Sequence, residues 1–288
     1  MILYFLITKE CYLDKSKFLS HRLLGYGSEE STIEALIHAM NSNAPRLEVD
    51  TRVSKDGVIY INHNPTIESK RSSLTIAKSS SKKIDKFINK HALSTPKLDD
   101  FLSVYTKRKN KRQILMLDIK DFGFEKEHVF FVNKHKLEKN IAWVSWIPQS
   151  LLRLDKLSPN STKILSYMPV NDFFANFTRN ISIKKVPFIP IVLIGEYFYK
   201  KPLGNFTHGY QHAYFSKELN QELILMLSKN GGGVCISKKI LTKELIAFNR
   251  SHNLKTAVFA AQDRREYTEL SNFGADIIFC DFTDSELS

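Results

Sequence analysis

Eight short apolar segments, separated by stretches with helical spacing, constrain the fold of this chain more than any other feature. Between the first and second of these segments, Ile33, Leu36 and Met40 recur at the spacing of a helix with one buried face. Strands that alternate with helices form a parallel sheet covered on both sides. Eight such strands predict an α/β fold, a (β/α)8 TIM barrel. The predicted strands are residues 17–20, 46–50, 113–119, 142–146, 163–168, 234–237, 255–260 and 276–281.

The length of the chain suits one barrel. A chain of 288 residues of which 43% are apolar can bury one large core. We therefore expect residues 1–288 to form a single domain. In barrels of this class the functional side chains lie at the carboxyl ends of the strands.

Two segments depart from the alternation of strands and helices. Residues 69–91 are rich in serine and lysine and are predicted to be an exposed polar connection that leads to a short helix. Residues 170–233, called the insertion below, separate the fifth and sixth predicted strands by more than a usual connection. The insertion has apolar and aromatic runs, so it is predicted to form either a wall for a leaving group or a structural subdomain. Gly231, Gly232 and Gly233 mark its return to the barrel.

Charged side chains gather at the ends of the first predicted strands. Because side chains alternate along a strand, Glu48 and Asp50 share one face. The Lys-Asp-Gly turn that follows reverses the chain and brings His63 back beside them. His21 and Arg22 end the preceding strand. Two carboxylates, two imidazoles and a guanidinium are therefore expected to converge, which is the layout of a catalytic site.

These residues belong to a longer series of short motifs. The motifs are His21-Arg22, Glu30-Ser31-Thr32, Glu48-Val49-Asp50, Lys55-Asp56-Gly57, His63-Asn64-Pro65-Thr66, Pro96 to Leu102, Leu117-Asp118-Ile119-Lys120, Val144-Ser145-Trp146 and Gly274 to Asp281. In order and spacing they resemble the signature of the glycerophosphodiester phosphodiesterases. The resemblance covers nearly the whole chain, and it implies the same barrel fold.

The resemblance also implies acid/base catalysis by His21 and His63. Imidazole titrates near neutral pH, so one ring can take a proton while the other gives one. The implied reaction is hydrolysis of a glycerophosphodiester, or of a lysophospholipid-like diester, to a phosphomonoester such as glycerol 3-phosphate and an alcohol. Which histidine acts first stays open. The other histidines lack such motifs and are predicted to be surface or helix residues, although His208 and His212 could touch substrate from the insertion.

A phosphodiester is negatively charged, so its hydrolysis requires cations near the phosphoryl oxygens. Glu48, Asp50 and Asp118 offer hard oxygen ligands for a divalent cation, Mg²⁺ or Ca²⁺. Without a cation, three convergent carboxylates would repel one another. Arg22 and Lys120 are expected to bind the phosphate, Arg22 through its planar fork and Lys120 as a point charge.

The chain departs from the family pattern at four places. Leu23 replaces a glycine, Asn64 replaces an aspartate, and Asp118 is one methylene shorter than the usual glutamate. The run from Phe259 to Gln262 replaces a more polar strand end. Asp118 indicates that the substrate class can differ. Leu23, Asn64 and the change from Phe259 to Gln262 keep open an alternative, a catalytically degenerate barrel that binds a phosphate ligand or an anionic membrane surface without turnover.

The charge of the chain bears on its partners. Lysine and arginine exceed the acidic residues to give a formal net charge of +12. Such a balance fits nucleic acid, an anionic membrane surface or a phosphate-bearing small molecule or lipid, although a solvated lysine-rich surface is commoner. The sequence has no nucleic-acid motif, so no nucleic acid is expected. A single basic face would favour peripheral membrane contact, and an even distribution would argue against it.

The N-terminal residues 1–7 are apolar but resemble no known targeting segment. They lack a basic leader and a small-residue cleavage site, and they are too short to span a bilayer. We expect them to pack across the bottom of the barrel. The expected location is cytoplasmic.

Overall fold

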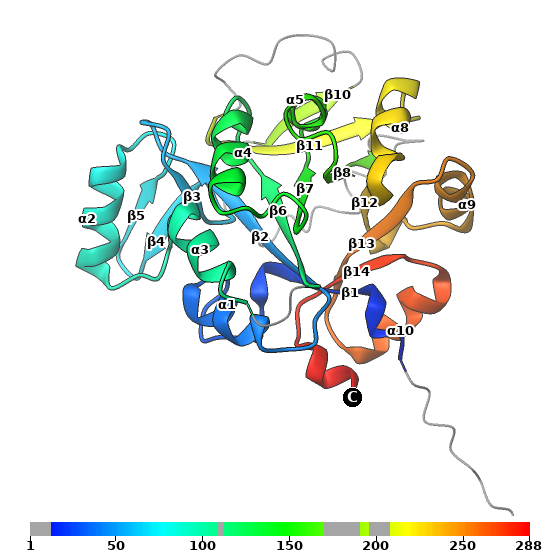
Figure 1. Cartoon of the computed structure of the whole chain (residues 1–288), viewed down its shortest axis with the longest axis horizontal. Coiled ribbons are helices and arrows are strands. Elements are labelled where there is room, and N and C mark those ends of the chain that lie inside the picture. The colour runs from blue at the N-terminus through cyan, green and yellow to red at the C-terminus, as the bar shows by residue number, and fades with distance from the viewer. Residues whose placement is uncertain (1–12, 109–111, 170–190, 196–207) are drawn as a thin grey trace, which may run out of the picture.

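The computed structural model describes residues 13–108, 112–169, 191–195 and 208–288. The N-terminal segment expected at the barrel bottom, and much of the insertion, lie outside the described residues. Eight strands of the largest sheet run parallel and close into a barrel through the pairing of Ser20 with Leu47. The predicted TIM barrel is therefore confirmed (Figure 1). Its strands are β1 (Phe18–Ser20), β2 (Arg46–Val53), β6 (Ile114–Ile119), β7 (Ile141–Ser145), β8 (Thr162–Ser166), β12 (Gly233–Ser237), β13 (Lys255–Ala261) and β14 (Ile277–Cys280).

Helices follow most of the barrel strands. Several begin at a side chain that caps the free amides of the first turn: the Thr32 hydroxyl accepts from the Ala35 N–H, and the Asp263 carboxylate accepts from the Glu266 N–H. The two helices predicted from apolar spacing, near residues 31–41 and 241–251, are present. The barrel helices are α1 (Ile33–Met40), α3 (Leu98–Tyr105), α4 (Glu125–Lys134), α5 (Pro148–Leu157), α8 (Gln221–Leu227), α9 (Lys243–Ser251) and α10 (Arg264–Phe273).

The alternation of side chains along each strand divides the apolar residues into two clusters. Leu47, Val49 and Leu117 point outward and pack under the helices. Met116, Val144 and other inward residues fill the middle of the barrel. The barrel is therefore filled at its centre by apolar side chains.

A small lobe follows β2 and projects at the left of Figure 1. It contains β3 (Ile59–Ile61), which pairs antiparallel with β2, then the hairpin of β4 (Thr66–Ser69) and β5 (Ser72–Thr75), and then α2 (Ser81–His91). The short helix expected at the end of this segment is present as α2, but the connection before it includes a hairpin strand and is not merely polar. The lobe has its own apolar cluster, formed by Tyr60, Ile67, Leu74, Ile76 and Ile84.

The insertion lies between β8 and β12, the fifth and sixth barrel strands, as predicted. Near it and within it, β9 (Met168–Pro169), β10 (Ile191–Gly195) and β11 (Gln211–Ser216) form a parallel sheet in the order β10, β11, β9. This sheet lies at the top of Figure 1. The prediction that the insertion forms a wall for a leaving group rested partly on residues that lie outside the described ones.

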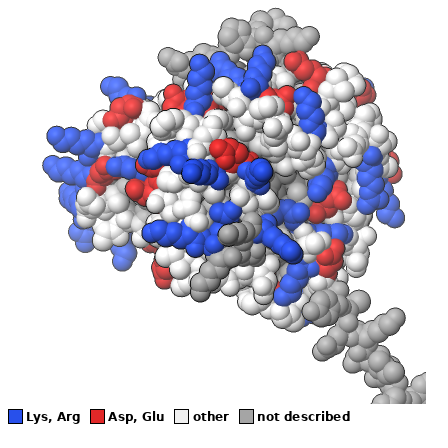
Figure 2. All heavy atoms as spheres, viewed as in Figure 1, with Lys and Arg blue, Asp and Glu red and all other residues white. Residues whose placement is uncertain are grey.

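The basic residues are spread over the surface in view. Figure 2 shows lysine and arginine over several parts of one face, with aspartate and glutamate among them. This face therefore lacks the continuous basic patch that the membrane hypothesis calls for. Within the part of the chain that the structure describes, no helix is both long enough and apolar enough to cross a bilayer.

The return of the insertion to the barrel generates a prediction about stability. A Cβ atom added at Gly233 would lie 2.0 Å from the Lys255 carbonyl oxygen of the paired strand. Because paired backbone cannot move aside, we expect Gly233→Ala to lower the free energy of unfolding by about 3 kcal/mol or more. Thermal and urea unfolding would measure the loss.

The matched control is Gly57→Ala. Gly57 has φ +84° and no atom within 4 Å of an added Cβ, so that variant should cost only the backbone strain, about 1 kcal/mol. Equal losses in the two variants would contradict this reading of the β12 start.

Candidate active site

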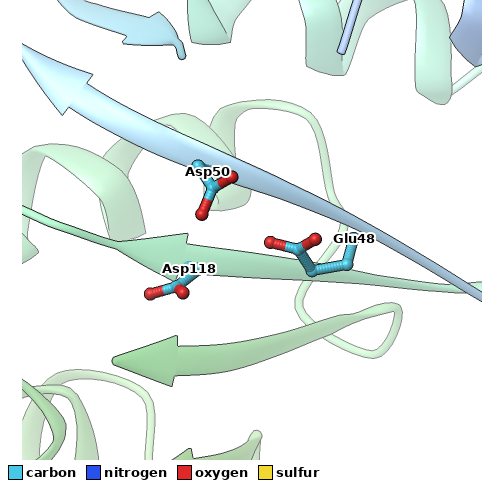
Figure 3. Close-up of side chains that lie close together, drawn as sticks. All are labelled: Glu48, Asp50 and Asp118. Atoms are coloured by element: carbon cyan, nitrogen blue, oxygen red, sulfur yellow. The ribbon is translucent and has the colours of Figure 1, made fainter. Parts of the chain in front are cut away.

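The parallel pairing of β2 with β6 brings three carboxylates together. Glu48 and Asp50 lie on the inward face of β2, and the register places Asp50 opposite Asp118 on β6. The three side chains are buried and offer ligand atoms that all lie within 4.8 Å of one another. Figure 3 shows them pointing toward one another from the two strands. The structure thus places the three predicted ligands together.

One buried cation lies among these carboxylates. Lys120 Nζ lies 2.7 Å from Asp50 Oδ1 and 2.6 Å from Asp118 Oδ2. Burial alone would lower the pKa of Lys120, but the two carboxylates outweigh it and raise that pKa. Burial also acts to raise the pKa of Asp50, but the charge and hydrogen bond of Lys120, together with the nearby His63 and Arg22, outweigh it and lower that pKa. For Glu48, burial and the charges of Asp50 and Asp118 raise the pKa well above its usual range.

The carboxylates fit a further cation. One lysine charge does not balance three carboxylates. Asp50 Oδ2 and Asp118 Oδ1 are buried and have no hydrogen-bond partner among the described residues. Such atoms are costly unless they are bound, and carboxylate oxygens are the ligands that Mg²⁺ and Ca²⁺ prefer. Glu48, Asp50 and Asp118 are therefore able to hold a divalent cation.

His21 lies where the barrel closes. It follows β1, and its Nδ1 lies 2.6 Å from Asp281 Oδ1, at the end of the neighbouring β14. Gln262 Nε2 donates to the other oxygen of Asp281. Burial raises the pKa of Asp281, but the bonds from His21 and Gln262 outweigh it and lower that pKa. The carboxylate therefore stays charged beside the imidazole and fixes its orientation.

The backbone after His21 turns in the left-handed region. Arg22 has φ +52° and Leu23 has φ +58°. In this conformation the Arg22 N–H donates to Glu48 Oε2 over 2.9 Å. Leu23 thus stands in a conformation that glycine adopts without strain, which is the residue that the family pattern has there. The Arg22 guanidinium reaches Glu30 Oε1 at 3.3 Å.

His63 is held from the other side, after β3. The Asn62 N–H donates to the Asp50 carbonyl oxygen over 3.0 Å, and His63 Nδ1 lies 3.0 Å from Asn64 Oδ1. Asn64 therefore supplies a hydrogen bond where the family pattern has aspartate. Burial lowers the pKa of His63 to about 4, although the Asp50 charge opposes the shift. His63 also lines a cavity of about 350 Å³ with Glu29, Glu30 and Glu68.

The predicted residues are thus brought together, although their roles stay predictions. Sequence reasoning missed a role for Asp281, whose signal was its position directly after a strand that pairs with β1. The expectation for His128 was incomplete: it lies on α4, as predicted, but is fully buried. Its Nε2 lies 2.9 Å from the Thr51 hydroxyl, which donates to the Asp118 carbonyl oxygen. His212 of the insertion is buried as well.

Comparisons with known proteins bear on the fold. No family model matches the sequence, and no curated protein matches it. Solved structures do match. A putative glycerophosphoryl diester phosphodiesterase from Silicibacter pomeroyi is 13% identical with a TM-score of 0.65, over 92% of this chain and 90% of the other. A putative glycerophosphodiester phosphodiesterase from Galdieria sulphuraria is 18% identical with a TM-score of 0.64, over 94% and 95% of the two chains.

A third similar structure holds a bound reaction product. A phosphodiesterase from Oleispira antarctica, in complex with the product sn-glycerol-3-phosphate, is 15% identical with a TM-score of 0.61, over 92% of this chain and 93% of the other. At these identities the likeness concerns the fold. The fold that the sequence motifs implied, that of the glycerophosphodiester phosphodiesterase structures, is confirmed.

The carboxylates generate a prediction that needs no substrate. A divalent cation that binds only the folded chain raises its stability, by about 2.7 kcal/mol at one hundred times the dissociation constant. We expect Mg²⁺ or Ca²⁺ to raise the melting temperature of the wild-type protein. Asp118→Asn should remove most of that rise, because it removes one ligand charge. Thermal unfolding over a cation titration would measure both.

Asp99→Asn serves as the control. Asp99 is a surface carboxylate that pairs with Lys134, outside the site, so this variant should keep the full response to the cation. An identical response in wild type and Asp118→Asn would show that the cation binds elsewhere.

Proposed function

We propose that this protein hydrolyses glycerophosphodiesters, or lysophospholipid-like diesters, to a phosphomonoester such as glycerol 3-phosphate and an alcohol. One observation carries the proposal: a buried carboxylate cluster, flanked by two histidines, lies on a barrel shared with glycerophosphodiester phosphodiesterase structures. The Oleispira antarctica structure, with its glycerol phosphate product, supports a small phosphodiester as the substrate class.

The proposed site provides positive charge to bind the negatively charged phosphate group. Glu48, Asp50 and Asp118 would hold Mg²⁺ or Ca²⁺, which when bound supplies positive charge to the phosphoryl oxygens. Arg22 lies beside this cluster, because its own N–H bonds Glu48. Its guanidinium is paired only with partly exposed Glu30 in the described part of the chain, so an arriving phosphate can compete for it.

The two histidines differ in their surroundings, which suggests how the protons move. Charged Asp281 stabilises a positive charge on His21, so His21 is suited to donate a proton to the leaving oxygen. In the described part of the chain the His63 ring bonds Asn64 rather than a carboxylate, and burial lowers its pKa to about 4, so His63 is suited to accept the proton of the substrate's attacking hydroxyl. In this two-step route, the glycerol hydroxyl beside the ester attacks the phosphorus, the alcohol leaves, and a cyclic phosphate forms. Water then opens that cyclic phosphate, and each ring exchanges its proton in the reverse direction.

The alternative of a barrel without turnover is not favoured. Asn64 and Gln262, which belong to two of the departures that motivated it, still make contacts within the site, Asn64 with His63 and Gln262 with Asp281. Peripheral contact with an anionic membrane is retained only as an aid to a lipid substrate.

Removal of either imidazole tests the proposed chemistry. We expect His21→Ala and His63→Ala each to lower kcat by about 10²- to 10⁴-fold while the fold is retained. The measurement is alcohol release from a panel of glycerophosphodiesters and lysophospholipids, with Mg²⁺ and with Ca²⁺. The control is His252→Ala, because His252 follows helix α9 and, within the described residues, its Nδ1 contacts Ser251 and Phe248 of that helix. Near wild-type turnover in either site variant would remove that residue from the mechanism.

The rim of the barrel favours a lipid-like substrate. Trp146 and Phe259 stack edge to face, with ring centroids 5.9 Å apart, at the carboxyl ends of β7 and β13. Phe259 and Ala260 are half-buried. They stand where the family pattern has polar groups, so this side of the site offers apolar contact. A buried methylene contributes about 0.8 kcal/mol.

A comparison of two substrates tests this preference. We expect a higher kcat/KM for a one-acyl lysophosphatidylcholine than for glycerophosphocholine. Phe259→Ala should lower the first value more than the second, because only the acyl chain uses the apolar rim. Equal efficiencies that respond equally to the substitution would leave free glycerophosphodiesters as the substrate class.

A further inference from the structure

A buried arginine lies directly behind His63. Arg52 shares the inward face of β2 with Glu48 and Asp50, and its side chain is fully buried. Its Nε donates to the His63 carbonyl oxygen over 3.1 Å, and its Nη1 donates to the Tyr210 carbonyl oxygen over 2.8 Å. One planar guanidinium therefore joins the proposed catalytic histidine to the insertion.

The partner of Arg52 makes the same connection through its own bonds. Asp121 Oδ1 lies 3.4 Å from Arg52 Nη1, and its side chain is also buried. The carboxylate accepts from the Val53 N–H over 2.9 Å and from the Gly209 N–H over 2.7 Å. The pair thus ties the end of β2, the end of β6 and the insertion into one buried network.

The segment 208–210 of the insertion is fitted closely against the lobe. His208 Nε2 lies 2.7 Å from the Val53 carbonyl oxygen. Gly209 has φ +84°, and a Cβ atom added there would lie 2.6 Å from Ala77 Cβ. Only glycine therefore fits at position 209 without a shift of the backbone. This close fit keeps the Gly209 N–H in place for Asp121 and the Tyr210 carbonyl oxygen in place for Arg52.

A buried ion pair needs an explanation other than stability. Apolar residues of similar volume are often as stabilising as a buried pair. The Arg52–Asp121 pair, however, makes directed bonds to backbone groups on both sides, which apolar side chains could not make. One of these bonds holds the His63 carbonyl oxygen itself.

We propose that Arg52 and Asp121 are positioning residues for His63, and that segment 208–210 sets the position of His63 through them. The inference rests on the proposed function for its kinetic consequence, but not for its structural one. A reacting group displaced by about 1 Å can lose about 10²-fold in rate, so a change in the distant segment should lower kcat.

The first experiment changes the segment and touches no proposed catalytic residue. In Gly209→Ala we expect kcat to fall by about 10-fold or more, with KM unchanged within about twofold. Adding Ala77→Gly removes the atom that the new Cβ would strike, so the double variant should recover part of the lost kcat. Ala77→Gly alone is the matched control. A wild-type kcat in Gly209→Ala, or a loss that the second change leaves untouched, would overturn the inference.

The second experiment replaces Arg52 with lysine, which keeps the positive charge but removes the planar guanidinium. Arg52→Lys cannot bond His63, Tyr210 and Asp121 together, so kcat should fall by about 10- to 100-fold. Arg46→Lys is the control, because Arg46 lies at the other end of β2 and bonds the Ser16 carbonyl oxygen. Equal losses of kcat in both lysine variants would indicate a general loss of stability and would overturn the positioning role.

A third measurement separates this inference from the proposed function. Amide hydrogen exchange of residues 61–64 needs no substrate, and it should speed up in Gly209→Ala and in Arg52→Lys but not in Arg46→Lys. If the wild-type protein hydrolyses no diester, the proposed function fails while this measurement still decides the linkage. Unchanged exchange in both Gly209→Ala and Arg52→Lys would overturn the linkage.

Discussion

The parallel pairing of β2 with β6 is the constraint on which the rest of the site depends. Its register places Asp50 opposite Asp118, inside a closed barrel. Glu48 lies two residues before Asp50, on the same face of β2. Buried carboxylates this close cannot all be charged unless cations accompany them. Lys120 supplies one cation, and the aspartate oxygens that have no partner among the described residues could bind a divalent cation as the other.

The barrel then adds an imidazole from each side of this cluster. Closure of the sheet sets β1 between β2 and β14, so His21 meets Asp281 across the strand ends. The short return strand β3 brings His63 over Asp50. Neither histidine is placed by its own helix or loop alone. The relative placement of the two histidines, the proposed acid and base, is therefore a property of the closed sheet, and it is sensitive to strand register.

The departures from the family pattern have local compensations. Asn64 gives His63 a hydrogen bond without a charge. Asp118, although one methylene shorter than glutamate, still lies within reach of Asp50 and Glu48. Leu23 accepts the left-handed backbone that lets the Arg22 N–H bond Glu48. These contacts explain how a chain with unusual residues at the site can retain its geometry.

The sequence by itself determined the barrel and the convergence at its strand ends. Apolar periodicity and strand alternation are local signals, so they place all eight strands and put Glu48 and Asp50 on one face. Tertiary structure alone decided the partners: Asp281 for His21, Lys120 between two aspartates, and Arg52 with Asp121 behind His63. It also decided the burial of His128 and the hairpin of the lobe. These contacts join residues far apart in the chain, and their energies depend on desolvation, which no local pattern records.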